Sequence, residues 1–257
     1  MRIAVAQLAI EPAMRTLTFQ RALRAIDAAA ETDPSPDVVL LPAFCDVPEV
    51  LAGNTEIVER LAGPTVAACG LRARHWGVFV ALGFAEQGPR EPYVTGVLLD
   101  NDGDVCVAHR QRRFSMMSGD GFSTGTDVCA ADVVLGRLAV LTGDDVLDDE
   151  AWDAAARAGA AVILGTTCWG RGQGKQSMDV AAVRGQIADH AKHYGLPCAV
   201  ADVMASDANA ALTFPGMSTI ANADGRILAA GEIGEATILW GDLDLQPASP
   251  TTIEDAE

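Results

Sequence analysis

Apolar positions repeat along the chain with two periods, and their alternation predicts strands interleaved with helices. Runs that are apolar at nearly every position, such as residues 37–42, are typical of strands buried on both faces. Spacings of three and four residues, as in residues 15–31, indicate amphipathic helices. The predicted strands cover residues 2–8, 37–42, 78–84, 93–100, 105–110, 136–141, 161–165 and 198–203, with three more short strands within 212–243. The predicted helices cover residues 15–31, 55–76 (interrupted around Gly63 and Pro64), 148–159 and 175–194.

The order of these elements is β-α-β-α-β-β, and it occurs twice. Such a repeat predicts an α/β protein in which two sheets pack face to face with helices outside, an α-β-β-α sandwich. We expect a single domain over residues 1–245, because no linker divides this range. Residues 246–257 are acidic and rich in Pro, Ser and Thr, which predicts a disordered tail. The first residues, MRIAVAQL, predict a strand and not a signal peptide.

Composition and charge narrow the classes of partner. The chain is 49% apolar and carries a formal net charge of −17, so phosphate-rich nucleic acids and anionic membrane surfaces would be repelled. No apolar run reaches the roughly 18–20 residues of a membrane-spanning helix. The six cysteines contain no C-x-x-C pair, so neither a zinc site nor another cofactor is expected. Reduced, buried thiols favour a cytoplasmic protein.

Several segments, in order along almost the whole chain, resemble the nitrilase superfamily of carbon–nitrogen hydrolases. The resemblance implies the sandwich described above, packed into homodimers or larger homo-oligomers. Its segments are RIAVAQ at 2–7, DVVLLP at 37–42, the stretch from Tyr93 to Arg110, RLAVLTGDD at 137–145, Glu150, and FPGMS at 214–218.

The same resemblance locates three catalytic positions of the family, and this sequence has none of the expected side chains there. The family places a general-base Glu after the Pro of the second strand, a Lys after the Arg of the Y-R-K motif, and a nucleophilic Cys at a strand–helix elbow. Here these positions are Ala43, Gln111 and Gly143. Loss of a covalent nucleophile alone costs a factor on the order of 10⁴–10⁶ in rate. We therefore expect no ordinary amidase or nitrilase activity.

Two interpretations remain open. In the first, the chain is a pseudoenzyme that acts by binding a small amide-like or carboxylate ligand, or another protein. In the second, it is a hydrolase or related enzyme of altered mechanism that uses Cys45 or Cys168 as nucleophile, or polar groups without covalent catalysis. Cys45 would share a face with Ala43 if the strand stays extended, and Cys168 follows a strand at the same end of its sheet. Either thiol borders the vacated pocket, or both are small buried residues.

Polar residues near these positions complete the candidate pocket. Gln111 and Arg113 lie in a basic stretch that could bind an anion or pair with nearby acids. Asp144 and Asp145 belong to an acidic cluster that also includes residues 148–150. It could hold a hard cation, but a structural acid followed by helix caps is the simpler interpretation, so no metal is expected. Trp169, beside Cys168, is included as a pocket residue.

Overall fold

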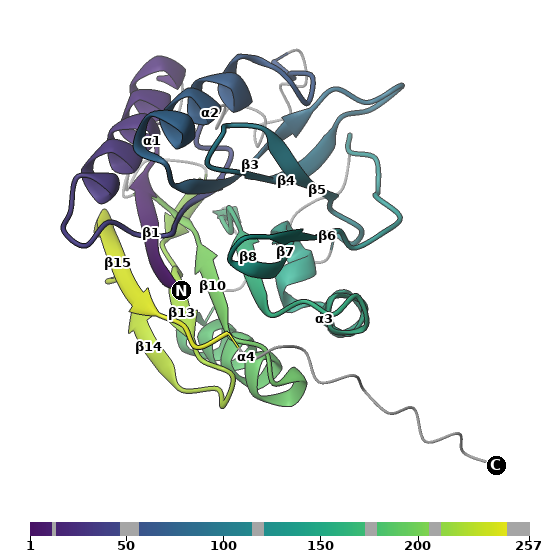
Figure 1. Ribbon diagram of the computed structural model, residues 1–257. Coiled ribbons are helices and arrows are strands. Elements are labelled where there is room, and N and C mark those ends of the chain that lie inside the picture. Colours follow the sequence, from purple (N-terminus) through teal and green to yellow (C-terminus); the bar gives the residue numbers. More distant parts are fainter. Residues whose placement is uncertain (12–13, 47–56, 115–120, 173–178, 206–211, 246–257) are drawn as a thin grey trace.

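Two sheets lie face to face, and helices cover their outer faces, in the computed structural model of the chain (Figure 1). The structure describes residues 1–11, 14–46, 57–114, 121–172, 179–205 and 212–245. Helices α1 (Arg15–Ala30) and α2 (Pro64–Trp76) cover one sheet, whereas α3 (Asp149–Arg157) and α4 (Val180–Tyr194) cover the other. The predicted α-β-β-α sandwich is confirmed.

The first sheet contains the N-terminal half of the chain together with short strands from the C-terminal half. Its order is β5-β4-β3-β2-β1-β11-β12-β9, and β15 also pairs with β1. The strands β1, β2 and β3 are parallel, while β3, β4 and β5 form an antiparallel meander. The bounds are β1 Arg2–Ala9, β2 Val38–Ala43, β3 Phe79–Glu86, β4 Tyr93–Leu99, β5 Val105–Arg110, β9 Arg171–Gly172, β11 Val203–Ala205, β12 Leu212–Pro215 and β15 Thr237–Asp242.

The second sheet has the order β14-β13-β10-β8-β7-β6. Its central strands β7, β8 and β10 are parallel, so their carboxyl ends lie at one edge. The bounds are β6 Ala130–Val133, β7 Gly136–Thr142, β8 Val162–Thr166, β10 Cys198–Ala201, β13 Thr219–Ala221 and β14 Ile227–Ala230.

Three apolar layers hold the sandwich together. One lies between α1, α2 and the first sheet, another between α3, α4 and the second sheet, and the third between the two sheets. The central layer joins residues such as Val5 and Leu40 to Val140 and Leu164 from the opposite sheet. These side chains are fully buried, which explains why both sheets need strands that are apolar at almost every position.

Some predicted elements are wrong in their extent. Residues 57–63 are not helical: Glu59 bridges to Glu86 at the end of β3, and α2 begins at Pro64, a residue suited to the first helical turn. Helix α4 begins at Val180, after the N-cap Asp179, and the predicted helical residues 175–178 lie outside the described residues. The strand predicted over 198–203 divides at Asp202, so that β10 pairs in one sheet and β11 in the other. The tail predicted at 246–257 lies outside the described residues.

Candidate functional site

The candidate site lies where parallel strands of both sheets end. Strand β2 ends at Ala43, β7 is followed directly by Gly143, and β8 leads into Thr167 and Cys168. The two sheets are joined here, because the backbone N–H of Ala43 donates to the carbonyl of Thr167 over 3.0 Å. The carboxyl ends of parallel strands are where α/β proteins usually bind ligands.

Ala43 lies in a small apolar cluster at this end of the sandwich. It is 1% exposed and shares the cluster with Phe44, Cys168 and Phe214. Space beside it is limited: a Cβ built on Gly83, its partner on the adjacent strand β3, would lie 2.8 Å from the Cβ of Ala43 and 2.8 Å from Oγ1 of Thr166 in the other sheet. Nothing at position 43 can accept a proton.

Gly143 begins a short 3₁₀ segment, Gly143–Leu147, with a φ of +57°. This left-handed conformation at a strand-to-helix turn is easily adopted by glycine. A Cβ at this position would lie 2.0 Å from Oε1 and 2.5 Å from Cδ of Gln111. The Gln111 carboxamide therefore occupies the space into which a side chain at 143 would project.

The Gln111 side chain is fully buried and is fixed by its neighbours. Its Nε2 donates to the carbonyl of Arg113 over 2.6 Å, and its backbone N–H donates to the carbonyl of Val94 over 2.8 Å. Its Oε1 is buried and has no hydrogen-bond partner within the described residues. An unpaired buried carbonyl costs about 1–3 kcal/mol, so only substantial packing would hold the amide in this position.

Asp145 fixes the segment that carries Gln111. Its carboxylate accepts from the backbone N–H groups of Arg112 and Arg113 at 2.7 and 2.9 Å, and it lies 2.8 Å from Nε2 of His109. Nδ1 of His109 lies 3.2 Å from the carbonyl of Asp127. Both ring nitrogens thus face acceptor atoms of the protein, which fixes the orientation of the imidazole ring.

The two candidate thiols are separated by the fold. The expectation that Cys45 shares a face with Ala43 is wrong: β2 ends at Ala43, and Phe44 has a φ of +54° that turns the chain. Cys45 consequently packs between the first sheet and the helices α1 and α2. Cys168 does lie in the cluster around Ala43. Burial raises the pKa of both thiols well above the ordinary value, which disfavours the nucleophilic thiolate.

The acidic residues after Gly143 have separate partners. Asp144 accepts from the indole N–H of Trp169 over 3.3 Å, while Asp148 caps α3 by accepting from the backbone N–H of Ala151. Arg113 is about half exposed and pairs with Asp148 and Glu150 at 3.3 and 2.6 Å. Among the residues that the structure describes, no three His, Cys, Asp or Glu side chains converge as a metal ligand set.

Asp202 was not among the residues predicted for the site. It lies between β10 and β11, where the chain passes from one sheet to the other, and it is fully buried. Its carboxylate accepts from Thr167 Oγ1 and from the backbone N–H groups of Trp169 and Met217, at 3.0–3.1 Å. Burial raises its pKa to about 6. The sequence signal was an acidic residue inside an apolar run.

Comparison with known proteins agrees with this architecture. A sequence model of the family described as carbon-nitrogen hydrolase matches residues 2–252. Among solved structures, the chain is similar to the amidase from Nesterenkonia sp. AN1. A Glu-to-Gln variant, with acrylamide added to the active-site cysteine, has a TM-score of 0.82 at 21% identity, over 95% of this chain and 93% of that one. A Cys-to-Ala variant in complex with butyramide has a TM-score of 0.80 at 21% identity, over 97% and 92%.

None of the helices in the described part of the chain has the length and apolar character to cross a membrane. The family match covers nearly the whole sequence, and the shared fold extends over both sheets and their helices. The chain therefore belongs to the carbon–nitrogen hydrolase family, within the nitrilase superfamily.

Proposed function

We propose that this chain is a family member that does not cleave C–N bonds through a covalent thiol intermediate, and that it acts by binding a small amide-like or carboxylate ligand, or another protein. One observation carries the proposal: the Gln111 carboxamide fills the space into which a side chain at Gly143, the position that the resemblance assigns to the nucleophile, would project. Ala43 and Gln111 likewise supply neither a base nor a positive charge. All three chemical roles of the family mechanism are thus missing together.

An enzyme of altered mechanism is the alternative, and the fold shared with amidases favours it. Such an enzyme would use either a new nucleophile or polar groups without a covalent step. Cys168 has the better position, since it adjoins Ala43, but it is only 1% exposed and its pKa is raised by burial and by the nearby Asp202. Neither Cys168 nor Cys45 has the cationic, accessible surroundings that activate a thiol.

Covalent labelling separates the two proposals. The folded protein would be treated with acrylamide, which adds to the active-site cysteine of the Nesterenkonia amidase, and examined by intact mass spectrometry. The half-buried Cys106 and Cys129 would first be replaced by Ser, so that only buried thiols remain. We expect no rapid adduct in the folded protein and complete reaction after denaturation. A rapid single adduct mapped to Cys45 or Cys168 would support the enzyme instead.

Hydrolysis and binding are then measured on the same preparation. Ammonia release from a panel of primary amides and nitriles should stay at the uncatalysed rate, with an active amidase of the family as positive control. An increase in melting temperature with an amide or carboxylate from the panel would identify the ligand class. Turnover of any panel member would contradict the proposal.

Assembly and cellular location are proposals of the same kind. We propose a homodimer or larger homo-oligomer, supported by the family's fold, and light scattering would measure its mass. We also propose a reducing, cytoplasmic location, supported by six cysteines that are all free thiols.

A further inference from the structure

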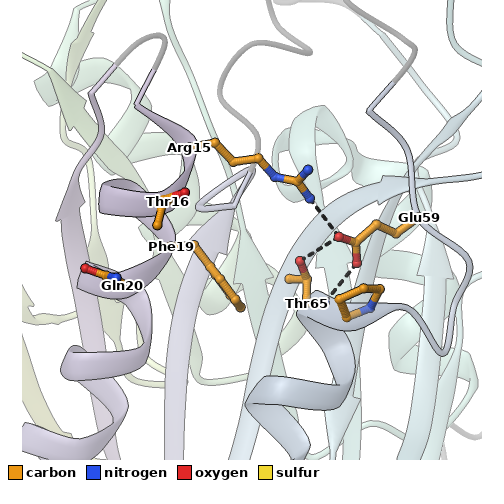
Figure 2. Close-up of a pocket in the computed structure, with 7 residues that line it drawn as sticks. Arg15, Thr16, Phe19, Gln20, Glu59 and Thr65 are labelled. Carbon is orange, nitrogen blue, oxygen red and sulfur yellow. Dashed lines mark hydrogen bonds and ion pairs between the residues drawn. The ribbon is translucent and has the colours of Figure 1, made fainter.

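Three side chains from separate segments meet in a buried cluster near the end of β2. Oγ1 of Thr65, in the first turn of α2, lies 2.9 Å from Oδ2 of Asp46 and 3.2 Å from Oε1 of Glu59. Glu59 also pairs with Arg15 of α1 at 2.8 Å and accepts from the backbone N–H of Thr65 at 2.8 Å. Figure 2 shows the Arg15 guanidinium and the Thr65 side chain both directed at the Glu59 carboxylate, and all three residues line a surface pocket.

If Asp46 and Glu59 were both ionised, the cluster would lack one of the two protons that its two contacts with Thr65 Oγ1 require. A threonine hydroxyl has one proton, so it can donate to only one of the two carboxylates. The other contact would then place two oxygen lone pairs against each other. One additional proton makes both contacts hydrogen bonds: a carboxyl O–H donates to Thr65 Oγ1, and Thr65 donates to the remaining carboxylate.

The surroundings place this proton on Asp46. Glu59 has a guanidinium and a backbone N–H to stabilise its negative charge. Asp46, in contrast, is 1% exposed, and its Oδ1 is buried without a hydrogen-bond partner in the described part of the chain. Burial raises the pKa of Asp46 to about 6, and the charge of Glu59 adds to this increase. A hydrogen bond donated by Thr65 to an ionised Asp46 opposes the increase, but Thr65 does not make this bond when it donates to Glu59.

We propose that Asp46 and Glu59 share one proton through the Thr65 hydroxyl, forming a pH-sensitive contact between the end of β2 and the start of α2. This inference does not depend on whether the chain cleaves C–N bonds. The contact brackets residues 47–56, because Asp46 precedes them and Glu59 follows them.

The groups that face Asp46 determine the direction of the effect. They are Glu59, Arg15 from α1, Thr65 and Cys69 from α2, and the adjacent Cys45. Burial raises the pKa of Cys69 to about 12 and that of Cys45 well above its ordinary value, so both thiols stay neutral. Ionisation of Asp46 therefore adds a negative charge opposite Glu59, and within the described residues Arg15 is the cation that offsets it. The contact is intact at low pH and weakens as the pH rises through about 6.

The direct test is a carboxyl titration by ¹³C NMR on the full chain labelled at aspartate. We expect the Asp46 carboxyl to titrate with a midpoint near pH 6; this midpoint should be absent in Asp46→Asn and should shift to lower pH in Glu59→Gln. Asp202 provides an internal control, because its own midpoint near 6 should remain in both variants. An Asp46 carboxyl that stays ionised down to pH 4, or a midpoint that Glu59→Gln leaves unchanged, would overturn the proposal.

The pH dependence of the unfolding equilibrium provides a second, independent test of the proposal. The unfolding constants of wild type and Asp46→Asn would be compared between pH 4 and pH 7. Their ratio should change on the order of 100-fold, because the pKa of Asp46 rises from 3.8 to about 6 on folding. Asp104→Asn, at an exposed turn residue, is the matched control and should leave the pH profile unchanged. A flat ratio for Asp46→Asn would contradict the shared proton.

Discussion

Replacement of Gly143 by Ala tests whether the Gln111 carboxamide fills the vacated position. The new Cβ would lie 2.0 Å from Oε1, 2.5 Å from Cδ and 2.9 Å from Nε2 of Gln111, distances at which one group must move. Displacing the amide breaks its bond to the Arg113 carbonyl, and such overpacking costs about 1–3 kcal/mol. The φ of +57° adds about 1–2 kcal/mol for a residue with a side chain. The expected total is about 2–5 kcal/mol.

Two glycines of this chain separate these contributions. Gly195, at the C-cap of α4, has a φ of +64° and no atom within 4 Å of a built Cβ, so Gly195→Ala measures the backbone term alone. Gly185, inside α4, also has open space and no positive φ; Gly185→Ala should stabilise by up to about 1 kcal/mol. The excess cost of Gly143→Ala over Gly195→Ala is the contact with Gln111.

A double-mutant cycle completes the test. In Gln111→Ala/Gly143→Ala the obstructing amide is gone, so the double variant should be more stable than the sum of the single effects by at least about 1 kcal/mol. Urea unfolding followed by circular dichroism gives each free energy. Additivity within about 0.5 kcal/mol would refute the packing of Gln111 against position 143.

Three further variants examine the surroundings of the site. Asp145→Asn should destabilise the fold by about 1–3 kcal/mol in urea unfolding, because the carboxamide NH₂ cannot accept a backbone N–H of Arg112 or Arg113 as the carboxylate oxygen does; an unchanged free energy of unfolding would contradict this role. Arg113→Ala should leave the urea midpoint nearly unchanged, since the Arg113 side chain is 52% exposed and water screens its ion pairs, and a clear decrease in the midpoint would contradict this expectation. Folding raises the pKa of Asp202 from 3.8 to about 6, because burial favours the neutral carboxyl. The neutral Asp202 therefore stabilises the folded state fully below pH 3.8, and this stabilisation is lost as the pH rises through 6. This contribution is about 3 kcal/mol, and Asp202→Asn should flatten that part of the pH–stability curve; an unchanged slope would refute the assignment.

Much of the fold could be predicted because strands and helices leave local periodic patterns. Strand β5 has the predicted bounds, and α1 differs by one residue at its end. The predicted bounds are wrong where long-range strand pairing overrides the local sequence pattern. Residues 57–62 contain neither Gly nor Pro, so their sequence is compatible with a helix. In the structure, however, the backbone of Glu59 is hydrogen-bonded to Ala85 and Gln87. The continuous apolar run 198–203 contains no indication that its two halves pair in different sheets.

The sequence by itself indicated the family, and the resemblance assigns the roles of base, positive charge and nucleophile to Ala43, Gln111 and Gly143, whose side chains cannot supply them in any conformation. Only the tertiary structure decided what replaces them. Gln111 and Gly143 are distant in sequence, and their contact exists because Asp145 draws the segment after β5 toward the elbow. Likewise, the positive φ of Phe44 turns Cys45 away from Ala43. Side-chain chemistry is fixed by residue identity, whereas proximity depends on long-range contacts that no local pattern encodes.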